Sequence, residues 1–230
     1  MTNTVLLNNV DHKELRVISK RGAQFGDAVM SAVTFPAEFR DLQAHYPIVF
    51  RKTNDGLSFD AIALLGFQED ENLFLGNAGW DTLYVPLLIE RQPFLIGNTG
   101  GELMMHVDLD SPRVSMTEGE PVFLPHGGNS DFLERMNSVL LSIHQGLQSA
   151  PSFISALMEH QLLESFVLDI ELNDGSQNRL AGFYTINEEK LQHLSGAVLE
   201  QFNRAGYLQA IFMVIASLSN FRALIERKNR

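Results

Sequence analysis

The sequence contains no cysteine, one tryptophan and only four tyrosines in 230 residues. The lack of cysteine excludes disulfides, thiolate nucleophiles and cysteine-ligated metals together. Basic residues are scarce as well. Lysine and arginine number 17 against 28 aspartates and glutamates, which gives a net charge of −11 at neutral pH. This negative balance argues against nucleic acid and against anionic lipid as partners, because both are polyanions.

Long apolar runs are also missing. The longest mostly apolar stretch, Tyr207–Leu218, contains Gln209 and is too short to cross about 30 Å of hydrocarbon. We interpret it as a buried helix and expect no membrane span. The opening "MTNTVLLNNVDHKELR" has no basic segment and no more than three consecutive apolar residues, which does not match a signal peptide. We therefore expect a cytoplasmic location.

Hydrophobic residues make up 45% of the chain, which is enough for a sizeable core. The first half contains short β-like segments between turn sequences. Asp55-Gly56 lies between two apolar runs and predicts a hairpin, because glycine accepts a positive φ there. The predicted strands are 48–52, 59–67, 73–75, 94–96, 103–109 and 113–116, with a short helix near 80–91.

The second half has helical periodicity. Asp131 with Glu134 predicts a capped helix start, and Pro151 is typical of the first turn of a following helix. Alternation in "FVLDIEL" predicts a hairpin that turns at "NDGSQN". The helix at 207–219 should be among the most buried elements, with Phe212 on its apolar face.

Strands followed by helices indicate an α+β fold, with an antiparallel, β-rich first half and a mainly helical second half that contains one hairpin. We expect a single domain over 1–230. A subdomain border near 124–131 would separate a β-rich part, 1–128, from a helical part with a hairpin, 129–230.

A metal site is one hypothesis for the chemistry. His106 and Asp108 have the spacing with which a strand can present two ligands of a facial triad to iron. The third ligand would be His144, His160 or His193, all on predicted helices. The alternative is a solvated strand end, and we expect no cofactor.

A binding site is the other hypothesis. The stretches "HYPIVFR" and "GWDTLYVPLLIER" concentrate aromatic residues and arginines in a chain otherwise poor in tryptophan and tyrosine. Aromatic rings could stack on a ligand, and an arginine could pair with the carboxylate of a peptide or an organic acid. In the competing interpretation the stretches pack against each other, with the arginines in water. The candidate residues are Tyr46, Arg51, Trp80, Tyr84 and Arg91.

Several strings together resemble the SapC family of bacterial proteins: "VTFPAEFRDLQAHYPIVFRK", "GWDTLYVPLLIERQPFLI", "DSPRVSMTEGEPVF" and "LNDGSQNRLAGFYTINEEKLQHLS". The resemblance implies an association with a bacterial surface layer. It also implies genes beside outer-membrane transporters, cupin-like hydroxylases and flavin-dependent halogenase-like proteins, and it carries no catalytic residue.

From these observations we expect a non-catalytic binding or accessory protein of a surface-layer or nutrient-uptake system, with a protein partner. The alternative function is an iron-dependent oxygenase that uses His106 and Asp108. A structural surface-layer component is a third option, and a homodimer stays open.

Overall fold

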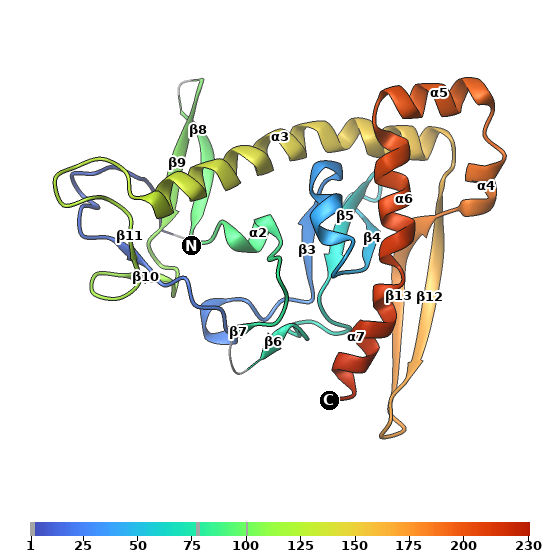
Figure 1. The fold of residues 1–230 in the computed structure, drawn as a ribbon, viewed down its shortest axis with the longest axis horizontal. Helices are drawn as coiled ribbons and strands as arrows, with labels where there is room; N and C mark the ends of the chain where they lie inside the picture. Colours follow the sequence, from blue (N-terminus) through green and yellow to red (C-terminus); the bar gives the residue numbers. More distant parts are fainter. Residues whose placement is uncertain (1–2, 77–78, 100) are drawn as a thin grey trace. The chain divides into compact units, whose positions relative to one another are not determined.

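The structure is a computed structural model that describes residues 3–76, 79–99 and 101–230. Figure 1 labels its helices and strands. The chain divides into two compact units, each assembled from separated segments. Unit 1 contains the residues up to Ala28, Leu75–Asp81 and Leu87–Gln145, whereas unit 2 contains Val29–Phe74, Thr82–Pro86 and Gly146–Arg230.

In the described part of unit 1 the strands form three small antiparallel sheets, with orders β1-β9-β8, β10-β2-β11 and β6-β7. The strands are β1 (Thr4–Leu6), β2 (Arg16–Val17), β6 (Leu75–Gly76), β7 (Gly79–Trp80), β8 (Phe94–Thr99), β9 (Glu102–Asp108), β10 (Val114–Ser115) and β11 (Glu120–Pro121). Two short helices belong to the same unit, η1 (Ala23–Phe25) and α2 (Leu87–Glu90). Buried side chains from β2, β8, β9 and the start of α3 form its core, including Val17, Phe94, Val107, Leu133 and Met136.

The helix α3 runs without interruption from Asp131 to Glu159. Two helices were expected here, so the prediction of a second start at Pro151 is wrong. The apolar period continues through the proline, and the burial of Phe153 and Leu157 outweighs the one hydrogen bond that proline cannot donate. The cap is also one residue earlier than predicted, because the hydroxyl of Ser130 accepts from the N–H of Leu133 at 3.2 Å.

Unit 2 is built on a five-stranded antiparallel sheet with the order β12-β13-β4-β5-β3. The strands are β3 (Ser31–Thr34), β4 (Ile48–Lys52), β5 (Phe59–Leu64), β12 (Leu163–Glu171) and β13 (Gln177–Ile186). Both predicted hairpins are present, β4–β5 and β12–β13. Tyr184 of β13 pairs with Phe50 of β4, so the C-terminal hairpin extends the N-terminal sheet. The α+β prediction is confirmed.

The turn of the β4–β5 hairpin shows why its sequence was informative. Gly56 has a φ of +70°, which a residue with a side chain rarely adopts. Asp55 accepts from the hydroxyl of Thr53 at 2.6 Å and from the N–H of Leu57 at 2.9 Å. These hydrogen bonds lower the pKa of Asp55, because they favour the carboxylate.

The helices of unit 2 cover this sheet and its ends. They are η2 (Pro36–Glu38), α1 (Phe39–Leu42), α4 (Glu188–Gln192), α5 (Gly196–Arg204), α6 (Tyr207–Ser217) and α7 (Asn220–Lys228), together with the second half of α3. Asn187 and Ser195 cap α4 and α5 through their side chains. Phe153 packs edge to face against Phe39, with ring centroids 6.1 Å apart, and against Tyr207 at 5.4 Å.

Helix α6 lies against β4 and β13 (Figure 1). Its buried side is formed by Ala210, Ile211, Val214 and Ser217. The hydroxyl of Ser217 accepts from the N–H of Ile48 at 2.9 Å, which fixes the helix to β4. Phe212 is 58% exposed, so its predicted burial is wrong. The apolar residues surround the whole helix, and periodicity alone could not select the packed side.

Tyr207–Lys228 is a helical stretch of 22 residues with a mean hydropathy of 1.6 in its most apolar window, of which 28% is buried. By length and composition it is the one candidate for a membrane span in the described chain, although core helices of soluble proteins meet the same criteria. The stretch is longer than the Tyr207–Leu218 segment considered from the sequence, because the helical region continues into α7.

Candidate functional site

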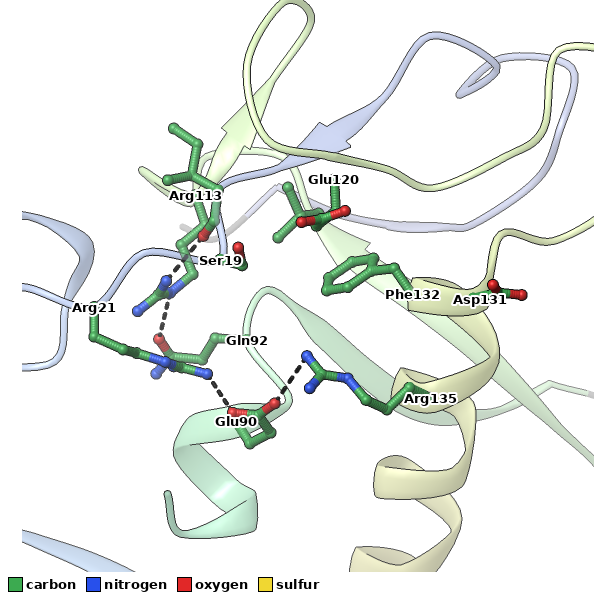
Figure 2. Close-up of a pocket in the computed structure, with 11 residues that line it drawn as sticks. Ser19, Arg21, Glu90, Gln92, Arg113, Glu120, Asp131, Phe132 and Arg135 are labelled. Carbon is green, nitrogen blue, oxygen red and sulfur yellow. Dashed lines mark hydrogen bonds and ion pairs between the residues drawn. The ribbon is translucent and has the colours of Figure 1, made fainter. Parts of the chain in front are cut away.

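A hollow of about 580 Å³ opens within unit 1. Its walls come from the end of β2 and the segment after it, the junction of α2 with β8, the residue before β10, the strand β11 and the first turns of α3 (Figure 2). Three arginines line it, Arg21, Arg113 and Arg135. We call it the arginine hollow. Its volume is within the range of small-molecule sites.

The buried end of the arginine hollow is an ion pair between Arg113 and Asp27. Their side chains are 1% and 0% exposed, and the Nη2–Oδ1 distance is 2.6 Å. The remaining donors of Arg113 bond to the carbonyl oxygens of Ile18 at 3.0 Å and Lys20 at 2.8 Å and to the Gln92 side chain at 3.4 Å. A buried charge requires this degree of pairing, because it has lost its hydration.

Burial lowers the pKa of Arg113, and the hydrogen bond and negative charge of Asp27 oppose that shift. Asp27 also fixes the preceding loop. Its second oxygen accepts from the N–H of Gly22 at 2.8 Å, and Arg21 lies 3.5 Å from its first. Asp27 therefore connects residues far apart in the chain, and it holds the wall of the hollow that carries Arg21.

The open end of the arginine hollow is organised by Glu90, the last residue of α2. One carboxylate oxygen pairs with Arg21 at 2.5 Å and the other with Arg135 at 3.1 Å, as the dashed lines in Figure 2 show. Exposure rises from 13% for Arg21 and 16% for Glu90 to 59% for Arg135. The charged groups thus extend from the buried Arg113 at the base of the hollow to the exposed Arg135 at its opening.

An aromatic ring and further polar groups complete the lining. Phe132 points its ring into the hollow, between Glu120 and Arg135 in Figure 2. The guanidinium of Arg135 lies 5.9 Å from the centre of that ring, one helical turn away. Ser19 and Gln92 add a hydroxyl and an amide to the lining. This combination of fixed charges, an aromatic face and neutral polar groups is suited to holding a small molecule.

The five residues predicted as a ligand site are divided between the two units, and none of them lines the arginine hollow. In unit 2, Tyr46 is fully buried, and its hydroxyl donates to the carbonyl oxygen of Tyr84. Tyr84 donates to Glu38 at 3.1 Å, and both burial and that carboxylate raise the pKa of Tyr84. Arg51 is exposed on β4, opposite Asp60 of β5.

In unit 1, Trp80 is half-buried on β7, where it pairs with Leu75. Arg91 follows α2, and its guanidinium donates to the carbonyl oxygen of Phe94 at 2.6 Å. Burial lowers the pKa of Arg91. Its neighbours Glu90 and Gln92 both line the arginine hollow. Ligand binding by the five predicted residues stays a prediction.

His106 and Asp108 lie on β9, and the His106 ring covers Gly97 of β8, where a Cβ atom would come within 2.7 Å of Cε1. Two of the expected third ligands, His160 and His193, have contacts of their own. His160 packs on Phe202 with ring centroids 5.2 Å apart, and Nδ1 of His193 lies 2.7 Å from the carbonyl oxygen of Glu189. Within 3–76, 79–99 and 101–230, no three histidine or acidic side chains are placed to hold a metal ion.

The charged network was missed from the sequence, although its residues were in view. Arg113 directly precedes a short strand, in a segment with few other cations, which does not by itself distinguish it from an ordinary surface charge. Nothing local identifies its carboxylate partner, because Asp27 is 86 residues away.

Comparison with known proteins identifies the family. The SapC family model matches residues 7–224, and the chain belongs to the SapC family. No curated protein and no solved structure matches it.

Proposed function

We propose that this protein is a non-catalytic binding or accessory protein of a bacterial surface-layer or nutrient-uptake system, working in the cytoplasm with protein partners. Cupin-like hydroxylases and halogenase-like proteins are the partner classes that the family resemblance suggests. Membership of the SapC family supports this choice of system.

The arginine hollow is the observation that supports a binding role most strongly. Its described lining combines ion-paired guanidinium and carboxylate groups with an aromatic ring, and it includes no histidine or lysine. A guanidinium stays protonated across the whole physiological range, so it can fix an anionic group but does not transfer protons. The ion pairs hold these groups in place before a ligand arrives, which lowers the entropy cost of binding.

Co-purification from a bacterium that expresses the protein tests the proposal. The tagged chain is cross-linked in growing cells, and the captured proteins are identified by mass spectrometry against a tagged unrelated protein of similar acidity. We expect enrichment of an uptake-system component or of a cupin-like or halogenase-like protein. A chain that sediments as a lone monomer and captures none of these classes under any growth condition contradicts the proposal.

The iron-dependent alternative receives a separate test, because no contact of His106 or Asp108 favours it. Metal content is measured by mass spectrometry after purification without chelators or an affinity metal. Binding as proposed predicts less than stoichiometric iron, with the same content in an Asp108→Asn variant. One iron per chain, lost in that variant, would establish the oxygenase site instead.

A further inference from the structure

We infer that the arginine hollow binds a small zwitterion with an apolar side chain, such as a short peptide, whose carboxylate pairs with Arg135 and whose ammonium group pairs with Glu120. The inference rests on the proposed binding role and names the ligand class for it.

Arg135 has hydrogen-bond donors available for a ligand. Its Nη2 pairs with Glu90 at 3.1 Å, and its other guanidinium nitrogens have no hydrogen bond to the described residues. The side chain is 59% exposed at the mouth of the hollow. A guanidinium carries five N–H donors, so Arg135 can keep Glu90 and still receive a carboxylate through a forked pair of hydrogen bonds.

The ion-pair network of the hollow contains more positive than negative groups. Three guanidinium groups, those of Arg21, Arg113 and Arg135, share two carboxylates, those of Asp27 and Glu90. One positive charge is therefore in excess inside a protein whose net charge is −11. The excess is at the exposed end, because the inner pairs are tightly matched. The carboxylate of a ligand would pair with that charge, whereas Glu120, which is outside the network, keeps a negative charge for the ligand's ammonium group.

Glu120 lies on the opposite side of the Phe132 ring from Arg135 (Figure 2). Glu120 is exposed, and in the described structure its carboxylate has no hydrogen bond or ion pair. The lining holds two other acidic residues. Glu90 is ion-paired with Arg21 and Arg135. Asp131 lies at the N-terminus of α3, where a negative charge is favoured, and its side chain points away from the other labelled residues in Figure 2. The hollow therefore presents one available cation and one available anion, separated by an aromatic face.

This arrangement matches a peptide better than a simple organic acid. A dipeptide places its ammonium and carboxylate groups at opposite ends, and an apolar side chain between them can pack on Phe132. A simple acid would satisfy Arg135 and leave Glu120 unpaired beside it. Ser19 and Gln92 supply hydrogen-bonding groups for the peptide bond.

Calorimetric titration of the full chain with matched dipeptides tests the inference. The probe is glycyl-phenylalanine. N-acetyl-glycyl-phenylalanine lacks the ammonium group, and glycyl-phenylalaninamide lacks the carboxylate. We expect the unmodified dipeptide to bind at least tenfold more tightly than the amide and several-fold more tightly than the acetylated form. Equal affinity for all three, or no binding heat with any of them, overturns the inference.

Variants assign the two charges to their partners. Arg135→Gln should weaken glycyl-phenylalanine at least tenfold and leave the amide unaffected, whereas Glu120→Gln should weaken the dipeptide and leave the acetylated form unaffected. The control is Arg204→Gln, which removes an exposed arginine of α5 that also pairs with a glutamate. Identical affinities for Arg135→Gln and Arg204→Gln, with unchanged melting temperatures, would contradict the assignment.

The two proposals can fail separately. If no dipeptide binds but the partner proteins are still captured, the ligand class is wrong and the accessory role stands. If partner capture fails as well, the proposed function is also wrong.

Discussion

Removal of the buried negative charge of Asp27 is predicted to destabilise the protein strongly. In Asp27→Asn the side chain keeps its shape, but Arg113 becomes a charge that is 1% exposed and has lost its counter-ion. Breaking a buried pair by removing one partner costs about 3–5 kcal/mol. The guanidinium keeps its bonds to the carbonyl oxygens of Ile18 and Lys20, so we expect a loss near the lower end, about 3 kcal/mol.

Urea unfolding followed by circular dichroism measures this loss, and an exposed ion pair supplies the control. Arg204 and Glu200 are 78% and 62% exposed, and Glu200→Gln should change the free energy of unfolding by less than about 1 kcal/mol. A loss below about 1 kcal/mol for Asp27→Asn, no larger than that of Glu200→Gln, would refute the description of the Arg113–Asp27 pair as the buried base of the arginine hollow.

Three further predictions concern unit 2. Gly146→Ala should lower the free energy of unfolding by about 1–2 kcal/mol, because its Cβ would lie 2.1 Å from the ring of Phe35. This overpacking outweighs the gain in helix propensity of about 1 kcal/mol. A variant more stable than the unmodified protein would contradict this contact. Because the pKa of Tyr84 is raised, its stabilising contribution is complete below its ordinary pKa of 10.0 and declines at higher pH. Urea unfolding between pH 8 and 11 should therefore show that the free energy of unfolding falls less steeply with pH in Tyr84→Phe than in the unmodified protein. An equal fall in both proteins would contradict the raised pKa. Phe212→Ala should cost less than about 1 kcal/mol, since the ring is 58% exposed, and a loss of 3 kcal/mol would place the ring in a core.

The parts of the fold that were predicted correctly depend on local signals. The Asp55-Gly56 turn and the alternation in β12 and β13 are confined to a few neighbouring residues, and both hairpins were found.

The errors occur where tertiary packing decides between local options. Pro151 looked like a helix start because its missing N–H is harmless there, yet burial of the residues around it continues α3 through the proline. In α6 the apolar residues occupy every side, and only the sheet determines that Ile211 is covered and Phe212 is not. Neither outcome can be read from a window of sequence.

The arginine hollow was beyond prediction for a related reason. Its ion pairs join residues 86 and 69 positions apart, and each residue alone resembles an ordinary surface charge. The sequence analysis selected Tyr46 and Trp80 instead, because tryptophan and tyrosine are rare in this chain. The stretch 79–91 was singled out for Arg91, whereas the residues that line the hollow are its neighbours, Glu90 inside that stretch and Gln92 just beyond it.

Chemical-shift mapping of the ¹⁵N-labelled protein with glycyl-phenylalanine is the most direct test of the central claim, that the arginine hollow is the ligand site. The account predicts concentration-dependent shifts of the backbone amides of Ser19, Gln92, Phe132 and Arg135, with those of unit 2 unchanged. Shifts confined to the amides around Tyr46 and Arg51, or no shifts at millimolar dipeptide, would contradict it.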